Sequence, residues 1–152
     1  RPDVAVGAPG VDVGLVSILS GPNGGTIRTF SGDPFTGFGT SLALLRPLGT
    51  GPVRLLVGEP GGVSNRGRVW LLDPTQPAAA SGIWFRNGFA GEQLGERLAT
   101  LGDVDGDGTP DFLASRSNAR IDIRSGVDGT VLHIFSGTAA DDFGFAFAGA
   151  GD

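Results

Sequence analysis

The sequence DVDGDGTPD at residues 103–111 places four aspartates within nine residues. At this spacing each pair of carboxylates repels by roughly 1 kcal/mol or more, even when water and salt screen the charges. A folded chain tolerates such repulsion when a cation binds between the carboxylates. The stretch therefore predicts a cation-binding loop, and the alternative is a solvated acidic turn that holds no ion.

The spacing of the oxygen atoms in this loop favours calcium, a hard ion that takes about six to eight oxygen ligands. The aspartates alternate at loop positions one, three and five, and Gly108 permits a sharp bend at position six. Magnesium fits less well because it rarely uses a cage made only of protein atoms. We therefore expect Ca²⁺, with ligands from Asp103, Asp105, Asp107, Thr109 through its carbonyl, and Asp111.

The loop begins like an EF-hand, but its surroundings differ from one. An EF-hand carries a bidentate Glu at position twelve, where this chain has Ala114. An EF-hand is also flanked by helices, whereas the short apolar runs LATL and DFLAS on either side of this loop suit strands. We therefore expect the loop to close a β-hairpin.

The composition indicates an all-β protein with many turns. The chain has 152 residues with 28 Gly, 10 Pro and 39% hydrophobic residues, which is enough for one domain with a core. No window sustains an apolar period of 3.6 residues, so we expect almost no helix. The absence of Cys excludes disulfides and thiolate metal sites.

The charge of the chain excludes some classes of partner. The formal net charge is −5, and the four loop aspartates leave only −1 for the rest of the chain. There is no basic surplus of the kind that nucleic-acid binding needs. No apolar run approaches the roughly 20 residues of a membrane-spanning helix.

Several segments recur at a spacing of about 50 residues, which indicates a repeat architecture. The segment DVAVGAPG at 3–10 recurs as RLLVGEPG at 54–61. The segment FGTSLA at 38–43 recurs as LGERLA at 94–99 and as FGFAFA at 143–148. The chain therefore contains three copies of one unit.

Each copy reads as four short strands separated by turn signals. The expected strands are 95–101, 111–116, 119–124 and 129–135 in the last copy, 38–46, 53–58, 67–72 and 82–86 in the middle copy, and 3–8, 13–19 and 25–30 in the first copy. The first copy lacks its own first strand, and the matching sequence, 143–150, stands at the other end of the chain. Four-stranded units that repeat at this length are typical of β-propeller blades.

These motifs resemble the FG-GAP repeats of integrin α-subunit propellers and their bacterial relatives. FG stands at 38–39 and 143–144, GAP at 7–9 with the variant GEP at 58–60, and the acidic loop at 103–111. The resemblance covers essentially the whole chain. It implies an extracellular or cell-surface recognition module in which calcium is structural.

Two copies depart from the family pattern. The middle copy has LRPLGTGPV at 45–53 in place of the acidic loop, so we expect no calcium there. The last copy has LG at 94–95 for FG and SRS at 115–117 for GAP.

The two ends of the chain match two parts of one calcium loop. Asp152 corresponds to loop position one and Asp3 to position nine, with the ligands between them missing. Alone these two carboxylates make a poor calcium site. The alternative reading is an arbitrary boundary of the chain.

Three blades cannot close a propeller, for which about four to eight are usual. We therefore expect a homodimer of six blades, in which each C-terminal strand completes a blade of the other copy. The expected units are blade one at 1–34 completed by 143–152, blade two at 35–91 and blade three at 92–142. The alternative is a piece of a longer propeller.

The function favoured by these patterns is a calcium-stabilised, non-catalytic binding scaffold for an extracellular protein or glycan. Polar and aromatic residues of the expected loops are the candidates for recognition, although each also fits an ordinary solvated or packing role. These candidates are Phe35, Asn65, Arg66 and Arg68.

A lectin-like, carbohydrate-binding propeller is the second hypothesis. Trp70 and Trp84 are its candidates, because an indole can stack on a sugar ring. Tryptophans at such positions more often fill the space between the sheets of neighbouring blades.

A polysaccharide-active enzyme is the third hypothesis. It would need two carboxylates flanking a cleft, and the candidate pairs outside the loop are Glu92 with Glu96 and Asp141 with Asp142. Neither pair lies in a recognisable catalytic motif. His133, the only histidine, is expected on the outward face of an outer strand, which does not suit a catalytic triad.

Overall fold

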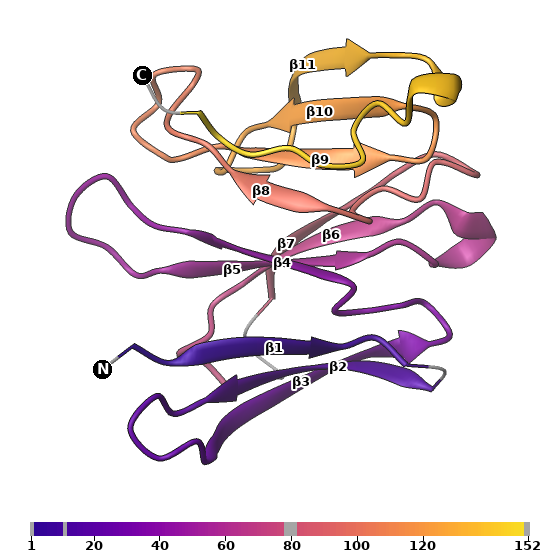
Figure 1. Ribbon diagram of the computed structural model, residues 1–152. Coiled ribbons are helices and arrows are strands. Elements are labelled where there is room, and N and C mark those ends of the chain that lie inside the picture. Colours follow the sequence, from indigo (N-terminus) through magenta and orange to yellow (C-terminus); the bar gives the residue numbers. More distant parts are fainter. Residues whose placement is uncertain (1, 11, 78–81, 151–152) are drawn as a thin grey trace.

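The computed structural model describes residues 2–10, 12–77 and 82–150. In this part of the chain three antiparallel sheets lie side by side in chain order, as Figure 1 shows. Each sheet is a meander in which consecutive strands pair. The expected all-β class is confirmed.

The first sheet has three strands and the other two have four each. The first sheet contains β1 (Val4–Ala8), β2 (Val13–Leu19) and β3 (Thr26–Pro34). The second contains β4 (Ser41–Leu45), β5 (Arg54–Glu59), β6 (Arg68–Leu72) and β7 (Gly82–Asn87). The third contains β8 (Leu98–Thr100), β9 (Phe112–Arg116), β10 (Arg120–Arg124) and β11 (Val131–Ser136).

Helix is almost absent from the described residues, as the sequence predicts. Two single-turn 3₁₀ helices occur, at Val63–Asn65 between β5 and β6 and at Ala139–Asp141 after β11. Both lie in connections and contribute no layer to the fold.

Every expected strand before residue 143 has a counterpart, but the first strand of each complete copy is shorter than expected. β4 begins at Ser41 and β8 at Leu98. The reason lies in the preceding glycines, because Gly39 and Gly95 have φ values of +90° and +88°. A residue with positive φ cannot continue an extended strand.

Two apolar cores lie between neighbouring sheets. Because successive side chains of a strand point to opposite faces, β5 contributes to both cores. Leu55 and Val57 face the first sheet, where they pack with Val16, Phe30, Phe38 and Leu72. Leu56 faces the third sheet and packs with Leu45, Val69, Leu71, Leu94, Phe112 and Ala114. Each sheet is thus held by its neighbours through buried aliphatic and aromatic side chains.

The glycines of the three FG-like motifs adopt one repeated geometry. A Cβ atom at Gly39 would lie 3.0 Å from a methyl of Val16 in β2, and one at Gly95 would lie 3.0 Å from a methyl of Val69 in β6. A Cβ atom at Gly144 would lie 3.1 Å from Ile121 in β10. Gly144 has a φ of +86°, close to the other two. It therefore lies on the third sheet as its counterparts lie on the first and second.

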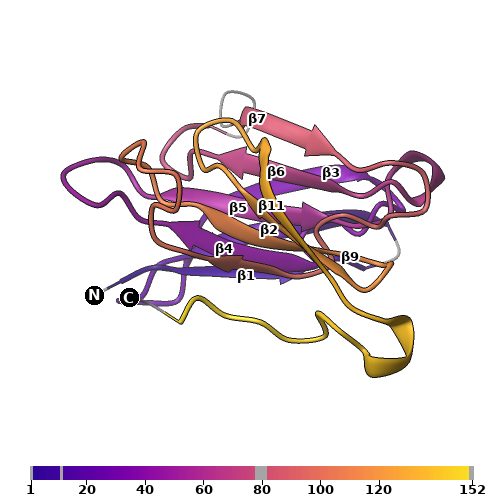
Figure 2. The same ribbon diagram turned by 90° about the horizontal axis from the view of Figure 1, so that it is seen from above.

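Residues 143–150, expected to be a strand, form none in this single chain. Figure 2 shows this segment, in yellow, leaving the third sheet and running back along its side. It forms no ladder hydrogen bonds with the strands that the structure describes. A strand needs a paired strand to satisfy its backbone groups, and no described strand pairs with this segment.

Candidate metal site

The acidic loop joins β8 to β9 and begins where the two strands stop pairing. Two backbone hydrogen bonds close its base: Leu101 N–H donates to the carbonyl of Asp111 at 2.8 Å, and Asp111 N–H to that of Gly102 at 3.0 Å. The expected hairpin is therefore present, with the loop at one end of the third sheet (Figure 1).

Three of the four loop carboxylates converge. Oxygen atoms of Asp103, Asp105 and Asp111 all lie within 4.8 Å of one another. Because Ca²⁺ binds oxygen at 2.3–2.6 Å, two ligands on opposite sides of one ion are about 5 Å apart. The spacing of these oxygens therefore fits a single ion of that size, and the cluster could hold a metal ion.

Backbone amides hold all three of these carboxylates in place, and Asp105 accepts from the Asp107 N–H at 3.1 Å. Asp103 accepts hydrogen bonds from the N–H groups of Gly106 at 2.8 Å and Gly108 at 2.7 Å. Asp111 is fully buried and accepts from Val104 at 2.7 Å and from Gly126, in the β10–β11 connection, at 3.0 Å. The loop is thus wrapped around its own carboxylates, which fixes their positions.

Asp107 is the expected carboxylate ligand that this cluster does not include. The Thr109 carbonyl stays an expected ligand. The Asp107 carboxylate accepts a hydrogen bond from the Thr109 N–H at 2.7 Å. The converging group therefore contains Asp103, Asp105 and Asp111.

The electrostatics of the loop favour a cation. Desolvation raises the pKa of Asp105 above its ordinary value, and repulsion from Asp107, Asp111 and Asp103 adds to the rise, against the Asp107 N–H that lowers it. A raised pKa means that the folded loop disfavours the negative charge on Asp105. A cation between the carboxylates would remove this cost.

A buried cluster of four charged residues lies between the second and third sheets, and no motif in the sequence predicts it. Arg116 donates to Glu92 at 2.5 Å and to Asp122 at 2.5 and 2.8 Å. Arg124 donates to the same oxygen of Asp122 at 2.7 and 3.1 Å. Two acids balance two arginines, and all four side chains are shielded from solvent.

Glu92, one of the first pair of candidate catalytic carboxylates, belongs to this cluster, and Glu96 does not. One oxygen of Glu92 binds Arg116, and the other accepts the Phe89 N–H at 2.8 Å. Glu96 instead is partly exposed and pairs with Arg97 at 3.2 Å. Both oxygens of Glu92 are thus occupied by structural partners.

The remaining enzyme candidates lie on the surface. Asp141 and Asp142 are exposed, and Asp141 accepts a hydrogen bond from the hydroxyl of Thr138. His133 is exposed on β11, the edge strand of the third sheet, as the sequence predicts.

Both tryptophans pack between sheets. Trp84 stacks on Phe112 of the third sheet with ring centroids 6.0 Å apart. Trp70 packs edge-on against Phe38 at 6.4 Å and donates its indole N–H to the buried Glu59 at 2.5 Å. Both side chains are half-buried, and both also line a hollow of about 660 Å³ along β7.

The candidate recognition residues differ in their contacts and in their exposure to solvent. Arg68 lies 5.0 Å over the ring of Trp70 and bonds to Glu59 at 3.3 Å, so it is part of the packing. Phe35, Asn65 and Arg66 are exposed in connections.

Asp3, in the expected split loop, accepts a hydrogen bond from the Gly21 N–H at 3.1 Å. Its expected companion, Asp152, lies outside the described residues.

Comparison of the sequence with protein-family models and with curated proteins gives no match. Within the described residues, no helix is long and apolar enough to cross a membrane.

Proposed function

We propose that the chain is a calcium-stabilised segment of an FG-GAP-type β-propeller that serves as a non-catalytic binding scaffold. The observation that carries this proposal is the convergence of Asp103, Asp105 and Asp111 in a hairpin loop of a repeated four-stranded unit. Calcium bound there ties β8 to β9 and stiffens the end of the third sheet.

The blade interpretation rests on the repeated contacts between units. Three sheets follow one another in chain order, and the FG-like glycines share one backbone conformation and one place on the preceding sheet. These are the relations expected between successive blades of one ring.

The exposed faces of the outer sheets support assembly with a second copy. Val4 and Val6 in β1 are 51% and 44% exposed, whereas their counterparts in β5, Leu55 and Val57, are fully buried. At the other end, Phe135 is 48% exposed, whereas its counterpart in β3, Phe30, is buried. Each outer face thus carries apolar residues whose counterparts in the internal interfaces are covered by a neighbouring sheet. In the single chain, no described sheet covers the outer faces.

We infer that these two faces meet between copies, giving a homodimer of six blades. Residues 143–150 then pair with the free edge of β1 in the other copy, so that each first sheet gains its fourth strand. This exchange satisfies two otherwise open strand edges.

Partner binding in place of catalysis is favoured by the state of the candidate acids. Glu92 is locked in a buried ion-pair cluster, and Asp141 and Asp142 lie on the surface. An extracellular protein or glycan is therefore the proposed partner class, and a cell-surface or secreted location follows from the resemblance alone.

Thermal unfolding in millimolar calcium and in EDTA tests the proposed metal role. Calcium should raise the melting temperature, and Asp105→Ala should abolish that rise. Asp142→Ala, which removes an exposed carboxylate outside the loop, serves as the control and should keep the full rise. Equal melting of the unaltered protein in calcium and in EDTA would contradict the proposal.

Light scattering after size exclusion tests the assembly. The homodimer has twice the 15.4 kDa mass of one chain. Phe135→Asp should give single chains, because it buries a charge in the proposed interface, whereas Phe89→Asp, at another exposed phenylalanine, should leave the dimer intact. A dimer that survives both Phe135→Asp and removal of residues 143–152 would refute the strand exchange.

A further inference from the structure

A cavity of about 420 Å³ lies between the first and second sheets, at the end where the β4–β5 connection lies. Most of its wall is aliphatic, with side chains from β1, β2, β4 and β5. The aliphatic lining includes Ala5, Ile18, Leu44 and Leu55. The volume falls within the range of small-molecule sites, about 300–1,000 Å³.

The repeat explains why this space exists. Ala5 in β1 corresponds to Leu56 in β5 and to Leu113 in β9, as the alignment of the three copies shows. Leu56 fills the corresponding position between the second and third sheets, where it is fully buried. Alanine at position 5 leaves that volume open between the first two sheets.

Two arginines line the cavity, Arg28 from β3 and Arg46 from the β4–β5 connection. In the part of the chain that the structure describes, neither guanidinium has a carboxylate within ion-pair distance. Arg28 donates one N–H to the carbonyl of Gln76 at 2.6 Å, but its buried Nε has no acceptor among the described residues. A buried donor without an acceptor costs free energy, and an anion that accepts this hydrogen bond would remove the cost.

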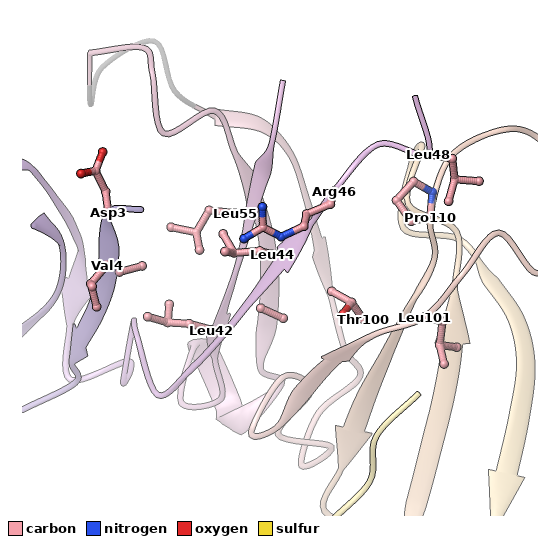
Figure 3. Close-up of a pocket in the computed structure, with 12 residues that line it drawn as sticks. Asp3, Val4, Leu42, Leu44, Arg46, Leu48, Leu55, Thr100, Leu101 and Pro110 are labelled. Carbon is pink, nitrogen blue, oxygen red and sulfur yellow. The ribbon is translucent and has the colours of Figure 1, made fainter. Parts of the chain in front are cut away.

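Arg46 also lines a second hollow. An adjoining hollow of about 540 Å³ shares Asp3, Leu44, Arg46 and Leu55 with the cavity. Figure 3 shows the Arg46 guanidinium lying near Leu44 and Leu55 in this hollow. Among the described residues, Asp3 is the only carboxylate in either wall, so the described lining of the cavity, with Arg28 and Arg46, carries a net positive charge.

We propose that the cavity binds a small amphipathic anion, a carboxylate with an aliphatic tail. The tail occupies the space that Ala5 leaves, and the carboxylate accepts hydrogen bonds from Arg46 and Arg28, whose fork-shaped guanidinium groups match it. Arg46 follows Leu45 where Gly102 follows Leu101 in the last copy. The middle copy thus offers a cation at the end where the last copy offers its acidic loop.

Isothermal titration of the unaltered protein with octanoate tests the proposal, with 1-octanol as the uncharged match. Octanoate should saturate one site per chain and bind at least ten times more tightly than octanol. Arg46→Gln should weaken octanoate binding at least tenfold. Arg66→Gln, at an exposed arginine in the β5–β6 connection, is the matched control and should bind as the unaltered protein does.

A second variant probes the cavity itself. Ala5→Leu places in the first copy the residue that the other two copies carry, so it should raise the melting temperature while abolishing octanoate binding. Titrations in calcium and in EDTA should agree, which separates this site from the acidic loop. The proposal is overturned if octanoate shows no saturable binding, if octanol binds equally well, or if Arg66→Gln weakens binding as much as Arg46→Gln does.

Discussion

The carbonyl oxygen of Gly39 lies so close to Gly7 that no side chain fits between them. A Cβ atom added at Gly7 would stand 2.1 Å from that oxygen. Gly58 and Gly95 repeat the relationship, with 2.0 Å between the added atom and the Gly95 oxygen. The glycine of the GAP-like motif therefore meets the glycine of the next FG-like motif across two sheets, which explains physically why the two motifs occur in register.

Substitution of Gly58 by alanine should destabilise the protein strongly. The added methyl group would clash with backbone atoms that cannot move away without separating the sheets, and overpacking of this kind costs about 1–3 kcal/mol or more. Gly49→Ala is the matched control, because nothing lies within 4 Å of a Cβ atom there. Urea unfolding measures both, and a Gly58→Ala variant as stable as Gly49→Ala would show that the sheets are packed less tightly than described.

Removal of Asp122 should be among the most damaging changes in the chain. Asp122→Ala leaves the buried Arg116 paired with Glu92 alone and removes the carboxylate that pairs with the buried Arg124. Breaking a buried ion pair on one side costs about 3–5 kcal/mol. Glu96→Ala removes a partly exposed carboxylate paired with Arg97 and should cost less than about 1 kcal/mol. Denaturant unfolding of both variants gives the comparison, and similar losses would contradict the assigned role of Asp122.

Asp111 and Asp105 should behave differently although both belong to the candidate metal site. Asp111→Ala removes the acceptor of two backbone N–H groups, so it should destabilise the protein by about 1–3 kcal/mol even in EDTA. Asp105 is exposed, and Asp105→Ala should affect only the part of the stability that depends on calcium. Unfolding curves with and without calcium separate the two cases. A calcium-free Asp111→Ala variant of unchanged stability would mean that the loop is held by other contacts.

The cluster of aspartates and most strands could be predicted from the sequence because both depend on local spacing. Alternate aspartates before a glycine bend fix the loop, and the period of about 50 residues fixes the order of strands. The buried ion pairs could not be foreseen in this way. Nothing in the local spacing of Arg116, Asp122 and Arg124 predicts their burial, and only the packing of the third sheet on the second brings Glu92 to them. Strand 143–150 was expected from its sequence, yet strand formation also requires a neighbour, which the single chain does not supply.

The stabilisation by calcium should weaken as the pH is lowered from neutrality. The pKa of Asp105 is raised, chiefly by desolvation and then by its neighbouring aspartates. A raised pKa means that folding favours the protonated form of Asp105. In the calcium-free protein, the contribution of Asp105 to the free energy of unfolding is therefore fully present at low pH, and it is lost as the pH rises through the raised pKa. Calcium reverses this dependence, because it binds the ionised carboxylate and competes with protons. The difference in melting temperature between calcium and EDTA should thus be largest near neutral pH and shrink through the acid range. Asp105→Asn, which cannot ionise, should show a smaller difference that depends less on pH. A difference for the unaltered protein that stays constant through the acid range would place the bound ion away from Asp105.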